Sequence, residues 1–112
     1  MGMWGFEAWD NDSAADWFGD LMGGTKLRGR WLEAMTGDFD GDEAEQPRAA
    51  LWLFAQLGHV YVWPIDEFDA DVKLALNVAD KLLSDEYLKE EIPDFLEGVQ
   101  RDRDAIAARQ KS

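Results

Sequence analysis

Hydrophobic residues recur at helical spacing along most of this chain. Apolar side chains three and four residues apart give each segment one apolar face, as in an amphipathic helix. The pattern predicts helices over residues 13–22, 25–36 and 48–57, over a segment with its apolar face at 72–83, and from Pro93 onward. A length of 112 residues suffices for one core. We therefore expect an all-α fold, a single helical domain of four to five helices over residues 1–112.

The segment 48–57 is apolar on nearly every side, which is typical of a helix surrounded by other helices. We expect it to be the central helix, with Trp52 and Phe54 in the core. By the same spacing, Trp17 and Trp31 are core residues. The aromatic residues of the N-terminal segment, among them Trp4, Phe6 and Trp9, are expected to pack on one end of the bundle.

Turn and cap signals separate these helices. Gly23-Gly24 and Gly37 end the first two, and Pro47 suits the first turn of the third. The β-branched and aromatic run 59–64 predicts either one short strand or an extended connector that ends at Pro64. Trp63, in this connector, is expected to be partly exposed. The carboxylates available to cap the next helix are Asp66, Asp69 and Asp71.

The net charge of the chain limits the classes of partner that it is expected to bind. Lysine and arginine total 11 against 24 acidic residues, so the net charge is -13. Because such a chain repels phosphate backbones, we expect no direct nucleic-acid binding. The longest apolar stretch, 49–55, is far short of the roughly 20 residues that span a bilayer, so no membrane insertion is expected. The absence of cysteine favours a reducing compartment, and we expect a cytoplasmic protein.

The opening of the chain carries a motif. It consists of Met1, Gly2, Trp4 and Gly5, then Trp9, Asp10, Asn11 and Asp12, and finally Ala14, Asp16 and Trp17. Over residues 1–22 the chain resembles a bacterial family named domain of unknown function 4259, whose members begin with Met-Gly-x-Trp-Gly, an aromatic residue, Asp-Asn-Asp and Ala-x-Asp-Trp. Members often carry glycine at the position of Glu7. The resemblance implies a small, mostly helical bacterial protein and supplies no catalytic residues.

Sites for metal or catalytic chemistry are weakly indicated. Asp10 and Asp12 are candidate ligands for a hard cation, although carboxylates at a helix start are more typical of capping. The acidic run from Asp38 fails as a calcium loop, because the sixth position lacks glycine and the twelfth lacks glutamate. His59, the only histidine, follows a C-terminal glycine and is expected to bond the last carbonyls of the helix before it. We therefore expect no enzyme and no cofactor.

The acidic surplus suggests a function in protein binding. Carboxylates are concentrated in the windows 38–45, 66–71 and 85–97. Complementary charge accelerates association with a basic protein. Our leading hypothesis is a non-enzymatic acidic protein that binds a basic partner, as an immunity protein, a nuclease inhibitor or a nucleic-acid mimic of the anti-CRISPR type would. The candidate contact residues are Asp38, Asp40, Asp42, Glu43, Glu45, Asp66, Glu67, Asp69, Asp71 and Trp63.

Two other functions remain open at this point. One is a divalent-metal enzyme with Asp10, Asp12 and Asp16 as ligands. The other is a structural or oligomerisation module in which the region of Trp63 is buried against a second copy.

Overall fold

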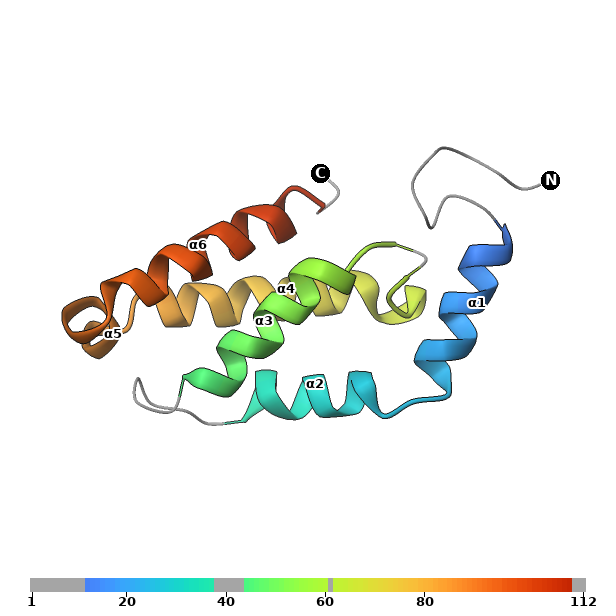
Figure 1. Cartoon of the computed structure of the whole chain (residues 1–112), viewed down its shortest axis with the longest axis horizontal. Coiled ribbons are helices and arrows are strands. Elements are labelled where there is room, and N and C mark those ends of the chain that lie inside the picture. The colour runs from blue at the N-terminus through green and yellow to red at the C-terminus, as the bar shows by residue number, and fades with distance from the viewer. Residues whose placement is uncertain (1–11, 38–43, 61, 110–112) are drawn as a thin grey trace.

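A computed structural model describes residues 12–37, 44–60 and 62–109 of the chain. These residues form α1 (Asp12–Gly23), α2 (Leu27–Thr36), α3 (Glu45–Leu57), α4 (Ile65–Leu83), α5 (Glu86–Glu91) and α6 (Pro93–Ala107) (Figure 1). Within the described residues the only β-type pairing is an isolated bridge between Val60 and Trp63, so the run 59–64 is a connector. The expected all-α fold is confirmed. The aromatic residues Trp4, Phe6 and Trp9 lie outside the described residues.

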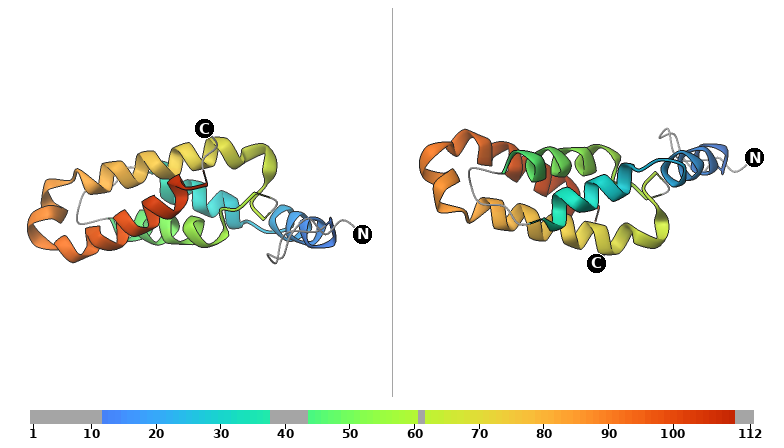
Figure 2. Two further views of the ribbon diagram at one scale, coloured as in Figure 1. Left: turned by 90° about the horizontal axis from the view of Figure 1, so that it is seen from above. Right: turned by 90° about the horizontal axis from the view of Figure 1, so that it is seen from below.

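Four helices form the body of the molecule. Successive members α2, α3, α4 and α6 run in alternating directions along its long axis (Figure 1). Viewed from above and below, α3 and α4 lie on opposite sides, with α2 and α6 between them (Figure 2). The contacts of α4 with α6, of α3 with α6, and of α2 with α3 account for most of the packing. This antiparallel arrangement follows from short connections between consecutive helices.

The core is centred on three aromatic rings from three different segments. Phe54 of α3 is fully buried, and its ring centroid lies 5.2 Å from that of Trp31 and 4.8 Å from that of Trp63. The two tryptophan rings meet edge to face at 5.0 Å. The indole nitrogen of Trp31 donates to the backbone carbonyl of Ala50 at 3.0 Å, so this polar group is satisfied inside the core.

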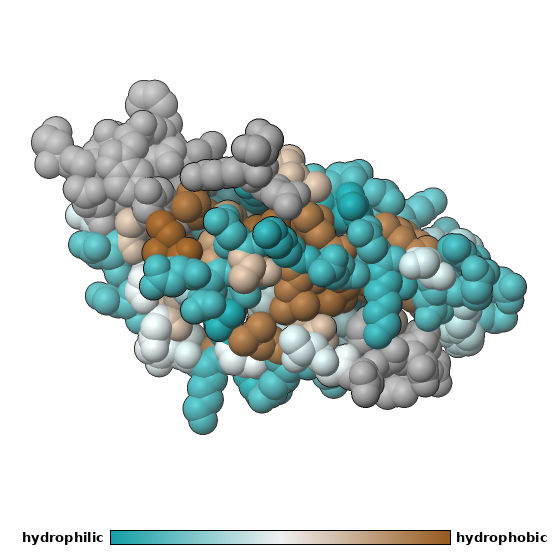
Figure 3. All heavy atoms as spheres, turned by 180° about the vertical axis from the view of Figure 1, so that it is seen from behind, coloured by the Kyte–Doolittle hydropathy of each residue, from teal (hydrophilic) through white to brown (hydrophobic). Residues whose placement is uncertain are grey.

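The expected apolar face of α4 is confirmed, since Val72, Ala75, Leu76, Ala79 and Leu82 are all buried. This face packs toward α3 and α6, while the other side of α4 faces solvent. Figure 3 shows the side of the molecule on which α4 lies. Hydrophilic side chains surround apolar ones that are visible toward the middle of this face.

Three tryptophans are placed differently from expectation. Trp52 is 48% exposed and Trp17 is 61% exposed, so their assignment to the core is wrong. Trp63 is 1% exposed, so its expected partial exposure is also wrong. A body of four helices leaves every helix with an outer side, and the apolar run of α3 does not reveal which of its residues lies there. Trp52 lies on that outer side.

The ends of the helices show which of the residues expected at helix termini occupy those positions. Pro93 is the first residue of α6, as expected, and Asp85 caps α5 by accepting a hydrogen bond from the Leu88 backbone N–H at 3.0 Å. At α4 the N-cap position is Pro64, and no side chain caps it. The expected capping by Asp66, Asp69 or Asp71 is therefore wrong, because these residues lie inside the helix.

Candidate protein-binding surface

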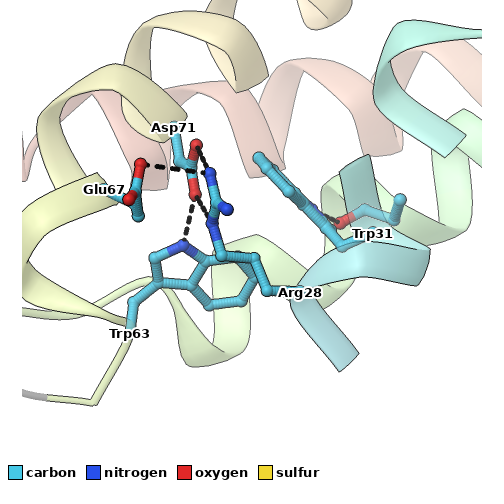
Figure 4. A network of polar contacts seen from close by, with 6 residues as sticks. Arg28, Trp31, Trp63, Glu67 and Asp71 are labelled. Atoms are coloured by element: carbon cyan, nitrogen blue, oxygen red, sulfur yellow. Dashed lines mark hydrogen bonds and ion pairs between the residues drawn. The ribbon is translucent and has the colours of Figure 1, made fainter. Parts of the chain in front are cut away.

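A buried polar network joins α2, α4 and the connector before α4 (Figure 4). Asp71 is 2% exposed and accepts hydrogen bonds from Arg28 at Nε (2.8 Å) and Nη2 (3.0 Å). It also accepts one from the Trp63 indole nitrogen at 2.7 Å. Glu67, one turn earlier on α4, lies 3.4 Å from Arg28 Nη2. The hydrogen bonds that Arg28 donates to Asp71 are the main cause that raises the pKa of Arg28 above its ordinary value.

This network removes two residues from the candidate contact set. Neither Asp71 nor Trp63 reaches the surface, and both are engaged with each other and, in the case of Asp71, with Arg28. Their assignment to a partner-binding surface is therefore wrong. A carboxylate that accepts three hydrogen bonds in the interior holds α2 and the connector against α4. The network is structural.

Other arginines are also engaged within the molecule. Arg48 Nη1 lies 2.6 Å from the carboxylate of Asp102, which is 4% exposed, and Arg103 Nε lies 2.6 Å from Asp80. Arg109 donates to the carbonyls of Phe54, Ala55 and Gly58 at the C-terminal end of α3. Cations favour this end of a helix because its carbonyls carry partial negative charge. These arginines are therefore poorly placed to bind an anionic partner.

His59 lies beside Arg109 at the same end of α3. Burial lowers the pKa of His59 below its ordinary value, the positive charge of Arg109 lowers it further, and a hydrogen bond to the backbone of Gln56 opposes both effects. The expected bond of His59 to the last turn of the preceding helix is thus confirmed. Most of the capping of this end comes from Arg109, which no local pattern indicates.

Those remaining candidate contact residues that the structure describes lie apart from one another. Asp38, Asp40, Asp42 and Glu43 lie outside the described residues. Glu45 is exposed at the start of α3, whereas Asp66 and Asp69 are exposed at the start of α4. Figure 1 shows that α3 begins toward α5 and that α4 begins toward α1, on opposite sides of the middle of the molecule. The described candidates do not form one surface.

Glu45 instead lies at the same end as α5 and the start of α6 (Figure 1). Between Asp85 and Glu97 the chain has six carboxylates and one lysine. Several exposed carboxylates are gathered here, and we call this set the acidic end. It consists of Glu45, Glu86, Glu90, Glu91, Asp94 and Glu97. The lysine, Lys89, lies 3.5 Å from Glu86. Within residues 85–97 the carboxylates therefore outnumber the cations six to one, and Arg48 lines the groove beside Glu45.

Local structure also places apolar side chains at the acidic end. Leu88 is fully buried and anchors α5, whereas Tyr87 beside it is 49% exposed. Pro93 disfavours a helical conformation at the residue before it, so α5 ends and Ile92 adopts φ -140° and ψ 64°. The Ile92 side chain is 44% exposed as a result. Sequence reasoning missed both residues, although Ile-Pro between two acidic runs is a visible signal of such a corner.

Two shallow apolar grooves flank the outer side of α3. The α3/α6 groove, of about 480 Å³, leads from Trp52 toward the acidic end and is lined by Glu45, Arg48, Ala49, Trp52 and Phe95. The α2/α3 groove, of about 410 Å³, is lined by Leu27, Arg30, Trp31, Ala34, Ala49, Ala50, Trp52 and Leu53. Trp52 and Ala49 belong to both, so the ridge between the grooves is itself apolar. Exposed aromatic residues in such positions are typical of protein contacts.

The structure describes two of the three candidate metal ligands. Asp10 lies outside the described residues, Asp12 is the first residue of α1, and Asp16 is exposed on the same helix. The described residues contain no group of three His, Cys, Asp or Glu side chains that could hold a metal ion. None of the helices described is long and apolar enough to span a membrane.

Comparison of the chain with protein-family models, with curated proteins and with solved structures finds no match. The resemblance of the N-terminal motif to domain of unknown function 4259 stays a prediction.

Proposed function

We propose that this chain is a non-enzymatic binding protein that engages a basic protein partner through its acidic end. The observation that carries the proposal is the pairing of carboxylates with exposed apolar side chains at one place. Tyr87 and Ile92 lie among the carboxylates of α5 and the start of α6, and the α3/α6 groove is lined by Glu45 of the acidic end and by Phe95, three residues after Ile92. Apolar anchors supply the contact area that holds a complex together, and the surrounding charge selects the partner.

Several arginines are engaged inside the molecule, and this supports a partner of positive charge. Arg28 and Arg48 are bound to the buried carboxylates of Asp71 and Asp102, and Arg109 to carbonyls of α3. The exposed surface at the acidic end consequently keeps its negative field. Carboxylates in such an array imitate phosphates, which is the physical basis for an inhibitor or immunity protein directed at a nuclease or another nucleic-acid-binding protein. A reducing compartment such as the cytoplasm suits a chain without cysteine.

Two charge-reversal variants test where the partner binds as well as the sign of its charge. The first is Glu91→Lys with Asp94→Lys at the acidic end, and the matched control is Asp66→Lys with Asp69→Lys at the start of α4. Both variants change the net charge equally. Pull-downs from cells that express the chain, at low and high salt, should retain a basic protein with the wild type and the control but lose it with the first variant.

Binding kinetics of the captured protein complete the test. The first variant should slow association, whereas Ile92→Ala, which keeps the charge, should speed dissociation by about tenfold. Equal loss of binding in the two charge-reversal variants would show that net charge alone attracts the partner. Unchanged binding in the first variant would overturn the proposal.

A further inference from the structure

Helix α1 presents an apolar stripe to solvent. Trp17 and Leu21 are one turn apart and are 61% and 45% exposed. Phe18 packs edge to face on Trp17, with ring centroids 5.1 Å apart. The adjacent side of the helix is held by Met22, which is buried in the core. With 12 residues, α1 is at the lower limit of length for a stable helix without packing, so a stripe of this kind calls for a second contact.

The α2/α3 groove is a matching apolar surface. Its lining is apolar except for Arg30, and no residue of α1 contributes to it. The Arg30 side chain is 79% exposed, and within the described part of the chain it forms an ion pair only with the exposed Glu33, at 3.4 Å. A pair of this type contributes little to stability, so Arg30 can exchange it for another carboxylate at small cost.

The charges of the two surfaces are complementary. Helix α1 contains Asp12, Asp16 and Asp20 and has no lysine or arginine. Asp20 lies three residues after Trp17 and directly before Leu21, at the edge of the stripe. A helix that places Trp17 and Leu21 in the α2/α3 groove therefore brings an aspartate to the rim where Arg30 lies. This is the usual mode of helix-in-groove recognition, with anchors one turn apart.

We propose that α1 of one copy docks in the α2/α3 groove of a second copy. Each chain carries both the helix and the groove, so a two-fold axis satisfies both contacts at once and closes the assembly as a dimer. Within one chain, α1 extends away from the end of the body at which it is attached, and α2 follows after a short turn (Figures 1 and 2). The proposal does not rest on the proposed function, because the acidic end lies at the opposite end of the molecule.

Disulfide trapping tests the contact directly, because the chain has no cysteine of its own. An equimolar mixture of the Asp20→Cys and Arg30→Cys single variants should form a mixed disulfide-linked dimer under mild oxidation. The control mixture, Asp66→Cys with Arg30→Cys, uses an exposed aspartate of another helix and should not. A mixture that cross-links no faster than the control would overturn the proposal.

Light scattering over a dilution series gives the second readout. The wild type should be a dimer that dissociates on dilution, and Trp17→Ala with Leu21→Ala should raise the dimer dissociation constant by at least about tenfold. Arg30→Glu should weaken the dimer, and adding Asp20→Lys to it should restore the affinity. A wild type that is monomeric at every concentration would overturn the proposal. The Asp20→Cys, Arg30→Cys double variant provides a further check. An intramolecular disulfide in a monomer of this variant would also overturn the proposal, because α1 would then fill the groove of its own chain.

Discussion

Two buried carboxylates could have been recognised from the positions that they occupy. Asp71 lies three residues after Phe68 and four before Ala75, on the apolar face of α4, and Asp102 lies three residues after Val99 and four before Ile106 on α6. A carboxylate on an apolar face needs a cation or several donors in the interior. The sequence does not identify those partners, because Arg28 and Arg48 come from distant segments and Trp63 from a connector with no helical pattern.

Removing the Asp71 carboxylate should be costly. In Asp71→Ala the buried indole N–H of Trp63 loses its acceptor and the guanidinium of Arg28 retains the longer contact with Glu67, so the free energy of unfolding should fall by about 3 kcal/mol. Urea denaturation followed by tryptophan fluorescence measures this change. The matched control is Asp69→Ala, an exposed aspartate two residues earlier, which should change stability by no more than about 0.5 kcal/mol. Equal effects of the two substitutions would contradict a structural role for Asp71.

At the scale of the element, the sequence predicts a helix well where apolar residues mark one side of a long segment. The face of α4 was identified in this way, and the ends of α1 and α2 were indicated by Gly23 and Gly37. Helix α5 was missed because six residues give too few turns for a periodicity to show. The orientation of α3 was missed for the opposite reason. Its residues are apolar almost all round, so the exposure of Trp52 depends on which neighbours the other helices provide.

Substitutions at two helical glycines distinguish the effect of intrinsic helix propensity on stability from the effect of packing. Gly29 in α2 has no atom near the position that a Cβ would take, so Gly29→Ala should stabilise the protein by up to about 1 kcal/mol. In α6 a Cβ on Gly98 would lie 2.5 Å from Arg48 Nη2, and Asp102 holds that guanidinium in place. Gly98→Ala should therefore bring no gain. The urea midpoints of the two variants provide the comparison, and an equal gain in both would show that Arg48 moves freely.

For the molecule as a whole, local sequence patterns do not predict which surface residues lie next to one another. The acidic windows are plain in the sequence, yet their described members lie toward opposite sides of the four-helix body. Glu45 therefore joins the carboxylates of α5 and α6 rather than those of α4. Which windows become neighbours is decided by the alternating directions of α2, α3, α4 and α6, and these directions follow only from tertiary packing.

The net charge of -13 leads to a prediction about salt. Exposed carboxylates at the acidic end repel one another within about 10 Å, the screening length at ~0.1 M salt, whereas the buried pairs Arg28–Asp71 and Arg48–Asp102 are screened much less. Added sodium chloride should therefore weaken repulsion more than attraction and raise the free energy of unfolding. Urea, which is uncharged, is the suitable denaturant for this measurement. The Glu91→Lys, Asp94→Lys variant should gain less from salt than the wild type, because part of the repulsion is already removed. A wild type that loses stability as salt is added would show instead that attraction between exposed opposite charges outweighs the repulsion.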